Sequence, residues 1–166
     1  VGPGDPALMT LMAVEAIKEA TLIAYPVADK GSDGVALSIA SSWISANQKR
    51  LPLLFPMVSE SAPRIRAWEE ASQRLVASVD QGEQVVLLCQ GDISLFASAS
   101  YVFLHIKKKY PKCPIQLIPG VTAISAAAAA AGWPLSLQKD QLLVLPTPDD
   151  PNSFEHIVDE AAVVGR

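Results

Sequence analysis

Apolar residues recur with a helical period from Leu8 to Ala20, which predicts an amphipathic helix. Asp5 and Pro6 precede this stretch in the positions of an N-cap and a first-turn residue. The next apolar run, Thr21 to Tyr25, is short and is followed by Pro26, so we expect a buried strand that ends at this proline. The buried face predicted for the helix comprises Leu8, Leu11, Met12, Ala16 and Ile17.

The alternation of helical and strand-like segments continues through the rest of the chain. Leu51 to Met57 is apolar but contains two prolines, which predicts an edge strand or an extended segment. Ala62 to Val79 has the clearest helical period, and Val85 to Cys89 is typical of a strand buried on both faces of a parallel sheet. We expect further helices at Val35 to Ile44, Leu95 to Lys108, Val121 to Ala131 and Ser153 to Val158, and further strands at Ile115 to Ile118 and Leu142 to Leu145.

Strands that alternate with helices predict an α/β fold with a mostly parallel sheet. The 166 residues are enough for one domain and the beginning of another. We expect an N-terminal α/β domain over residues 1–132, and residues 133–166 to begin a second, truncated α/β domain. The chain opens with loop residues and closes just after a helical stretch, so we expect both ends to be cuts through a larger protein.

Composition excludes several classes of function. The net charge is -4, with 13 basic and 17 acidic residues, which argues against a nucleic-acid partner. Two cysteines, Cys89 and Cys113, form no disulfide framework, so we expect reduced thiols and a cytoplasmic protein. The two histidines, His105 and His156, have no clustered partners, and no apolar stretch has membrane-spanning length. We therefore expect neither a metal site nor a membrane partner.

Three glycine-containing loops are the candidates for chemistry. Gly2 to Pro6 would follow a missing strand, Gly91 to Ser94 follows the run that ends at Cys89, and Pro119 to Ala123 follows another predicted strand. Ligands of parallel sheets bind outside the carboxyl ends of the strands, and glycine lets the backbone approach a ligand closely. The loops thus predict a preformed pocket for a small molecule, although none has the spacing of a phosphate or dinucleotide loop.

The same loops carry a family resemblance. The sequence resembles the tetrapyrrole (corrin/porphyrin) methylase family at Val1 to Pro6, Gly91-Asp92, Pro119 to Ala128 and Gly132 to Leu135, which span nearly the whole chain. It departs from the family at Ile93, where a proline is frequent. Shorter pieces resemble the precorrin-2 C20-methyltransferase branch, namely Leu22 to Pro26, Leu51 to Met57, Ala67 to Glu69 and Gly91 to Ser98.

The resemblance implies a two-domain α/β enzyme, usually a homodimer, that binds S-adenosylmethionine between its domains. It implies methylation of C20 of precorrin-2 or cobalt-factor II in cobalamin (vitamin B12) biosynthesis, with S-adenosylhomocysteine as a product. The cofactor-binding residues that it implies are Pro3, Gln90, Asp92, Leu95, Thr122 and Ala123.

Methyl transfer from a sulfonium to an electron-rich carbon needs mainly positioning and exclusion of water. The sequence accordingly names no catalytic residue, and Asp5 is a better candidate for an N-cap than for a base. Trp43, Trp68 and Trp133 fit core packing better than stacking on a macrocycle. The alternatives are another branch of the family, acting at another corrin carbon, on uroporphyrinogen III or on a non-tetrapyrrole acceptor, and a non-catalytic nucleoside-binding module. Recognition of a polycarboxylate substrate would fall to some of Lys30, Lys49, Arg50, Arg64 and Arg66.

Overall fold

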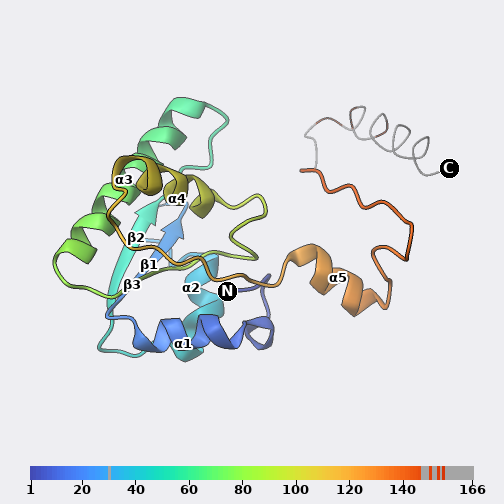
Figure 1. Ribbon diagram of the computed structural model, residues 1–166, viewed down its shortest axis with the longest axis horizontal. Helices are drawn as coiled ribbons and strands as arrows, with labels where there is room; N and C mark the ends of the chain where they lie inside the picture. The colour runs from blue at the N-terminus through green and yellow to red at the C-terminus, as the bar shows by residue number, and fades with distance from the viewer. Residues whose placement is uncertain (30, 147–149, 151–152, 154, 156–166) are drawn as a thin grey trace. The chain divides into compact units, whose positions relative to one another are not determined.

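The computed structural model describes residues 1–29, 31–146, 150, 153 and 155, and it divides into two compact units, Val1–Ala123 and Ile124–Arg166. The first unit is a layered α/β structure with a parallel sheet, as the sequence predicts (Figure 1). The predicted domain boundary after residue 132 stays a prediction.

The sheet has three parallel strands with β1 (Leu22–Val27) in the centre, between β2 (Lys49–Leu54) and β3 (Val85–Leu87). The predicted end of the first strand before Pro26 is wrong, because β1 continues through this proline. The backbone N–H of Leu22 points toward the β3 side, where it donates to Gln84. Because backbone N–H groups of a strand point to alternate sides, the nitrogen of Pro26, four residues later, points to the same side. The last β1 residue that pairs with β3 is Ala24, so the N–H that proline lacks is not needed there.

Helices cover both faces of this sheet (Figure 1). On one face lie α1 (Leu11–Glu19) and α2 (Val35–Ala40), and on the other lie α3 (Ser61–Asp80) and α4 (Ser98–Lys109). Side chains of β1 alternate between the two layers, and burial of each large aliphatic side chain contributes about 1.5–3 kcal/mol. The first core cluster contains Ile17, Ala20, Ile23, Tyr25, Val27, Ala36, Leu37, Ala40 and Leu88, and the second contains Leu22, Ala24, Leu53, Phe55, Ala71, Leu75, Val76, Val102 and Ile106.

The first helical stretch is two elements instead of one. Asp5 caps the 3-10 helix η1 (Pro6–Leu8), where its carboxylate accepts a hydrogen bond from the backbone of Ala7 at 2.8 Å. Thr10 caps α1 itself. The predicted N-cap role of Asp5 is therefore right in kind, but it applies to a shorter helix.

This break changes which face of α1 is buried. Leu11 and Met12, predicted as core residues, are 81% and 50% exposed. The buried residues of α1 are Val14 and Ile17. Because the chain between Leu8 and α1 is extended, the helical period cannot be counted across it.

Other elements lie close to their predicted positions. Strand β2 and helix α3 match the predicted edge strand and the clearest predicted helix, and α2 is followed by the 3-10 helix η2 (Ser41–Trp43). Helix α4 begins at Ser98, three residues after its predicted start. Helix α5 (Ala123–Ala131) ends as predicted, because Gly132 adopts a φ of 64° and the backbone of Trp133 donates to Ala128.

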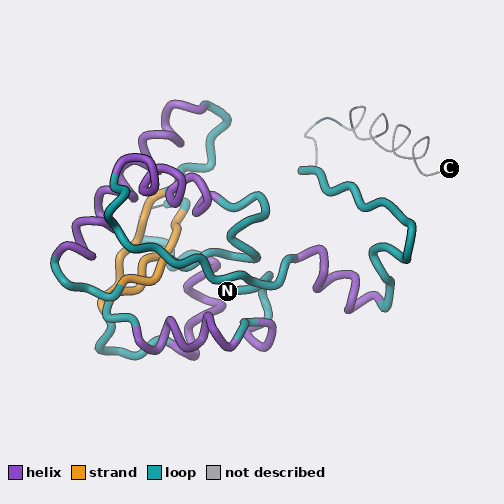
Figure 2. Tube along the Cα trace, in the orientation of Figure 1, coloured by secondary structure: helices purple, strands orange, loops and turns teal. Residues whose placement is uncertain are grey.

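Two predicted strands are wrong. Ile115 to Ile118 and Leu142 to Leu145 are loop, and no strand lies between α4 and α5 in the described chain (Figure 2). Both segments are apolar enough for a strand, but a strand also requires a hydrogen-bonded neighbour, and neither has one among the described residues. The predicted helix from Ser153 to Val158 lies largely outside the described residues.

The amino ends of the three strands are joined to one another. The backbone N–H of Thr21 donates to Gln84 at 2.9 Å, and that of Lys49 donates to Thr21 at 2.9 Å. The Glu83 carboxylate accepts hydrogen bonds from the Lys49 ammonium and the Thr21 hydroxyl, which lower the pKa of Glu83. These contacts lie at the edge of the sheet opposite to the predicted loops.

Candidate functional site

The structure brings the three predicted loops together at the carboxyl edge of the sheet. Gly2 and Gly91 form an isolated antiparallel bridge, in which Gly91 N donates to Gly2 O at 2.7 Å and Gly2 N donates to Gly91 O at 3.3 Å. The hydroxyl of Thr10 donates to the carbonyl of Pro119 at 3.3 Å. The first loop is therefore bonded to the second, and the residue that caps α1 is bonded to the third.

Asp92 joins the second loop to the third. Its side chain is buried, with 9% exposure, and Oδ2 accepts a hydrogen bond from the backbone of Gly120 at 2.7 Å. Oδ1 accepts from the backbone of Ser94 at 2.8 Å and from the Ser94 hydroxyl. The bond from Ser94, followed by that from Gly120, lowers the pKa of Asp92 against the opposing effect of burial. The carboxylate is thus ionised and held by the protein on both oxygens.

The second and third loops pack too closely for a side chain at Gly120. A Cβ placed there would lie 2.2 Å from the carbonyl oxygen of Gly91, so the residue must be glycine for this contact to form. Gly91 itself has a φ of 70°, and its own Cβ position faces open space. The space on the Cβ side of Gly91 is therefore open, whereas the second loop fills that of Gly120.

The residues predicted to bind a cofactor lie on these loops or, for Gln90 and Leu95, directly beside the second loop. The Gln90 side-chain amide donates to the carbonyl of Pro3 at 3.2 Å, which is a second link between the first two loops. Leu95 is half-buried beyond Asp92. Thr122 is half-buried and Ala123 is exposed, where the third loop enters α5.

Sequence reasoning missed the partners that organise this site. Ser94 and Gly120 hold the Asp92 carboxylate, and Phe96 lies four residues after Asp92 with a φ of 49° and 63% exposure. The spacing Asp92-x-Ser94 is the sequence signal of a local side-chain-to-backbone turn. No comparable local signal marks the left-handed backbone of Phe96, because this conformation is uncommon for an aromatic residue.

The basic residues considered for a polycarboxylate divide between the two edges of the sheet. Lys49 binds Glu83 at the amino edge, and the adjacent Arg50 also lies at the start of β2. Arg64 and Arg66 are exposed in the first turns of α3, which follows the carboxyl end of β2. Only this pair is on the side of the loops; Lys30 lies outside the described residues.

The tryptophans differ in environment. Trp68 is half-buried against the second core cluster and stacks on Tyr101 with the ring centroids 4.1 Å apart, which agrees with core packing. Trp43 is 36% exposed and lies 4.8 Å from the ammonium of Lys18. Trp133 is 75% exposed. Core packing is therefore the wrong prediction for Trp43 and Trp133, because both residues are exposed.

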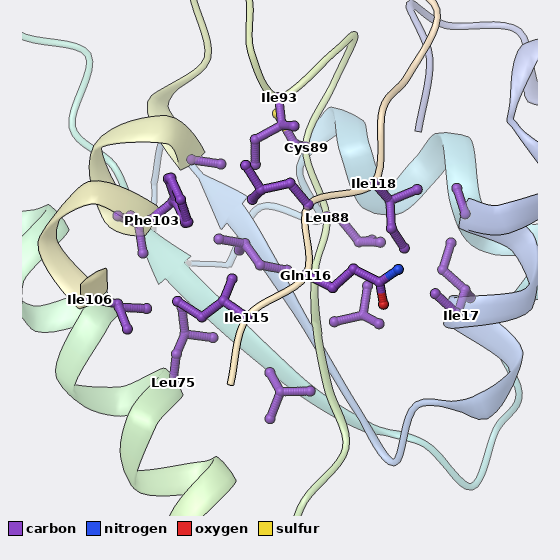
Figure 3. Close-up of a pocket in the computed structure, with 18 of the residues that line it drawn as sticks. Ile17, Leu75, Leu88, Cys89, Ile93, Phe103, Ile106, Ile115, Gln116 and Ile118 are labelled. Atoms are coloured by element: carbon purple, nitrogen blue, oxygen red, sulfur yellow. The ribbon is translucent and has the colours of Figure 1, made fainter. Parts of the chain in front are cut away.

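An apolar cavity of about 330 Å³ lies in the first unit between β3 and residues 113–119, and Gly91, Ile93 and Pro119 of the loops contribute to its lining (Figure 3). None of the six predicted cofactor-binding residues lines it. Across the described residues we find no group of three or more His, Cys, Asp and Glu side chains able to hold a metal, and no helix long and apolar enough to cross a bilayer.

Comparison with known proteins shows to which family this chain belongs. A sequence profile described as tetrapyrrole (corrin/porphyrin) methylases matches residues 1–164. The chain belongs to this family. The family predicted from the loops is thereby confirmed, and the α/β architecture agrees with it.

Individual relatives indicate the branch. The chain is 32% identical over 146 residues to the cobalt-precorrin-2 C(20)-methyltransferase of Salmonella typhimurium, covering 87% of this chain and 60% of that protein. It is 31% identical to the probable cobalt-precorrin-2 C(20)-methyltransferase of Methanocaldococcus jannaschii, covering 96% of this chain and 66% of that one. The predicted resemblance to the C20 branch is confirmed, and the chain spans about two thirds or less of the length of these relatives.

A solved methyltransferase structure, CobJ, has a similar fold. It aligns with a TM-score of 0.61 and 26% identity, covering 99% of this chain and 61% of that one. The similarity extends through the segments that carry the three loops, so the family's fold and its loop sequence coincide in this chain.

Proposed function

We propose that this chain belongs to an enzyme that transfers a methyl group from S-adenosylmethionine to C20 of precorrin-2 or of its cobalt form. The observation that carries the proposal is the set of three hydrogen-bonded loops at the carboxyl edge of a parallel sheet. The names of the C20-methyltransferase relatives support the choice of acceptor. The resemblance also favours a homodimer, which we include in the proposal.

The residues of the loops fit a nucleoside cofactor. The space on the Cβ side of Gly91 is open, and the half-buried Leu95 of the same segment offers apolar surface. We assign direct contact with the cofactor to Pro3, Gln90, Leu95, Thr122 and Ala123. Asp92 belongs to the same site as a positioning residue, because its two oxygens already accept hydrogen bonds from Ser94 and Gly120.

The cofactor supplies a methyl group that is already activated by attachment to a positively charged sulfur. The protein therefore has to orient the donor and the acceptor carbon in line and keep water away from them. Loops fixed by Asp92 and by the Gly2–Gly91 bridge can orient the donor in this way, since they need little reorganisation when a ligand binds. No side chain of the loops is required as a nucleophile.

Recognition of a polycarboxylate acceptor falls to cations near the same edge. Arg66 is exposed, and Arg64 donates to the carbonyls of Ser59 and Glu60 while its charge remains exposed. Guanidinium groups bind carboxylates through paired hydrogen bonds. We assign this role to Arg64 and Arg66 in preference to Lys49, whose ammonium is paired with Glu83.

Calorimetric titration of S-adenosylhomocysteine tests the cofactor site. We expect micromolar-range binding, a typical affinity of about -8 kcal/mol, to the chain and to Thr122→Ser, and none to Thr122→Trp. Turnover with precorrin-2, cobalt-factor II and uroporphyrinogen III then tests the acceptor. Binding without turnover of any of them would leave a nucleoside-binding module, and no binding to the folded protein would remove the methyltransferase proposal.

A further inference from the structure

Strand β2 is an edge of the sheet in the described residues, since β1 is the one strand that pairs with it there. The backbone N–H of Phe55, which follows β2, donates to Val27 of β1 at 2.8 Å, so Phe55 faces β1. Because the backbone groups of a strand point to alternate sides, Arg50, Pro52 and Leu54 direct theirs away from the sheet. We call these three residues the outer row of β2.

An outer row of this kind is a surface on which another strand can pair. The unpaired N–H and C=O groups of an edge strand form a template for a second chain unless something blocks them. Strand β2 has six residues, which is a common length for a paired strand. Leu54 is 41% exposed, so a partner strand would also cover apolar surface. A second copy of β2 is therefore a natural partner for this edge unless the edge is closed.

Pro52 stands in the middle of the outer row and is exposed. If two copies of β2 met antiparallel about a two-fold axis at this position, each Arg50 would pair with Leu54 of the second copy. The two prolines would then face each other. Because proline has no N–H, this central pair would bring two carbonyl groups together with no donor between them.

The outward carbonyl of Pro52 already has a partner. Arg74 of α3 donates to it from Nη1 at 3.1 Å, so the guanidinium group covers the acceptor at the centre of the outer row. Like charges that face each other across two strands are unfavourable, so the Arg74 of one copy would also repel that of the other. Arg50 adds a further exposed cation to the row. Charged side chains and proline are the devices that keep sheet edges from associating.

We propose that Pro52 and Arg74 close the outer edge of β2 against strand pairing, and that the partner they exclude is the same edge of a second copy of this chain. Pro52 removes the central donor, and Arg74 covers the central acceptor. Either residue is sufficient, because the central pair of an antiparallel ladder exchanges both kinds of bond. The homodimer included in the proposed function therefore forms through a different surface.

The double variant Pro52→Thr/Arg74→Ala restores the central donor and uncovers the central acceptor. We expect its association constant, measured by sedimentation velocity over a range of concentrations, to exceed that of the natural protein by about tenfold or more. The matched control is Pro52→Thr/Arg66→Ala, which removes the same charge from the same helix but keeps Arg74. We expect this control to associate as the natural protein does.

Amide hydrogen exchange shows whether the association uses the outer row. At concentrations where the double variant associates, exchange at Arg50 and Leu54 should slow by about tenfold or more. The amide of Phe55 is already bonded to Val27 and serves as the internal reference. In the natural protein, exchange at Leu54 should not depend on concentration.

Unchanged association of the double variant would overturn the proposal. Equal association of the control would also overturn it, because Arg74 would then close nothing. Protection of Leu54 that rises with the concentration of the natural protein would have the same meaning, since the edge would already be paired. This last measurement needs no substitution, so it decides the question even if the double variant does not fold.

Discussion

The backbone N–H of Gly120 donates to the carboxylate of Asp92 over 2.7 Å, although the two residues are 28 positions apart. This bond and the close approach of Gly120 to the carbonyl of Gly91 fix the third loop on the second. The geometry of the candidate cofactor site therefore depends on a side chain that need not touch the cofactor.

Asp92→Asn removes one of two anionic acceptors and turns an amide NH₂ toward Ser94 or Gly120. We expect the free energy of unfolding to fall by about 1–3 kcal/mol, because one buried donor loses its partner. We also expect weaker binding of S-adenosylhomocysteine. Urea unfolding and calorimetry check the two effects. Asp5→Asn is the control, since asparagine caps a helix as well as aspartate does; an equal loss in the control would contradict the prediction.

The contribution of Asp92 should depend on pH. The folded state lowers the pKa of this carboxyl below its ordinary value of about 3.9, so the folded protein binds its proton less readily than the unfolded chain. The stabilisation is therefore complete above about pH 4 and is lost as the pH falls through the lower, folded-state pKa. The difference in unfolding free energy between the natural protein and Asp92→Asn should shrink between neutral pH and about pH 2–3. A constant difference would contradict this account.

Gly120→Ala should destabilise the protein, because the new methyl group would meet the Gly91 carbonyl oxygen at 2.2 Å. Overpacking of this kind lowers the free energy of unfolding by about 1–3 kcal/mol. Gly4→Ala is the matched control in the first loop, where a Cβ would meet no atom within 4 Å. Thermal unfolding of the two variants should separate them clearly, and equal melting temperatures would show that the third loop does not pack on the second.

Gln90→Ala removes the bond to the Pro3 carbonyl. Because Gln90 is exposed, we expect little change in stability. On the proposed function we expect S-adenosylhomocysteine to bind about three- to tenfold more weakly, since the first loop loses one of its links to the second. Gln81→Ala, at the exposed end of α3, should leave the affinity unchanged. Unchanged affinity in Gln90→Ala would exclude this residue from the site.

Gln48→Ala tests a buried side chain far from the loops. The Gln48 amide donates to the carbonyls of Ile17 and Ala20 at 2.6 and 2.7 Å, and its oxygen accepts from the backbone of Ser45 at 2.7 Å. Loss of these bonds should lower the unfolding free energy by about 1–3 kcal/mol without affecting cofactor binding. Asn47→Ala, at the exposed neighbouring position, should change stability by less than about 0.5 kcal/mol.

Sequence patterns predicted the elements that their own local sequence determines. The period of Ala62 to Val79 matches α3 within one residue at each end, because a long amphipathic face determines a helix locally. The loops could be recognised for a similar reason, since glycine, proline and aspartate mark turns by their own conformational preferences.

Features that depend on distant partners could not be predicted in this way. Ile115 to Ile118 has a strand pattern, yet whether it pairs depends on what lies beside β3. The burial of Asp92 depends on Gly120, and the exposure of Leu11 depends on a break in the helix before Thr10. In each case the local pattern is correct and the tertiary environment decides the outcome.

The contacts of Thr21, Lys49, Glu83 and Gln84 align all three strands at the amino edge of the sheet. The alignment is thereby independent of the residues at the opposite edge. Substitutions in the loops can then alter what is recognised without shifting the register of the strands beneath them. This separation offers a physical reason why one scaffold could diversify toward several acceptors while its frame stayed the same.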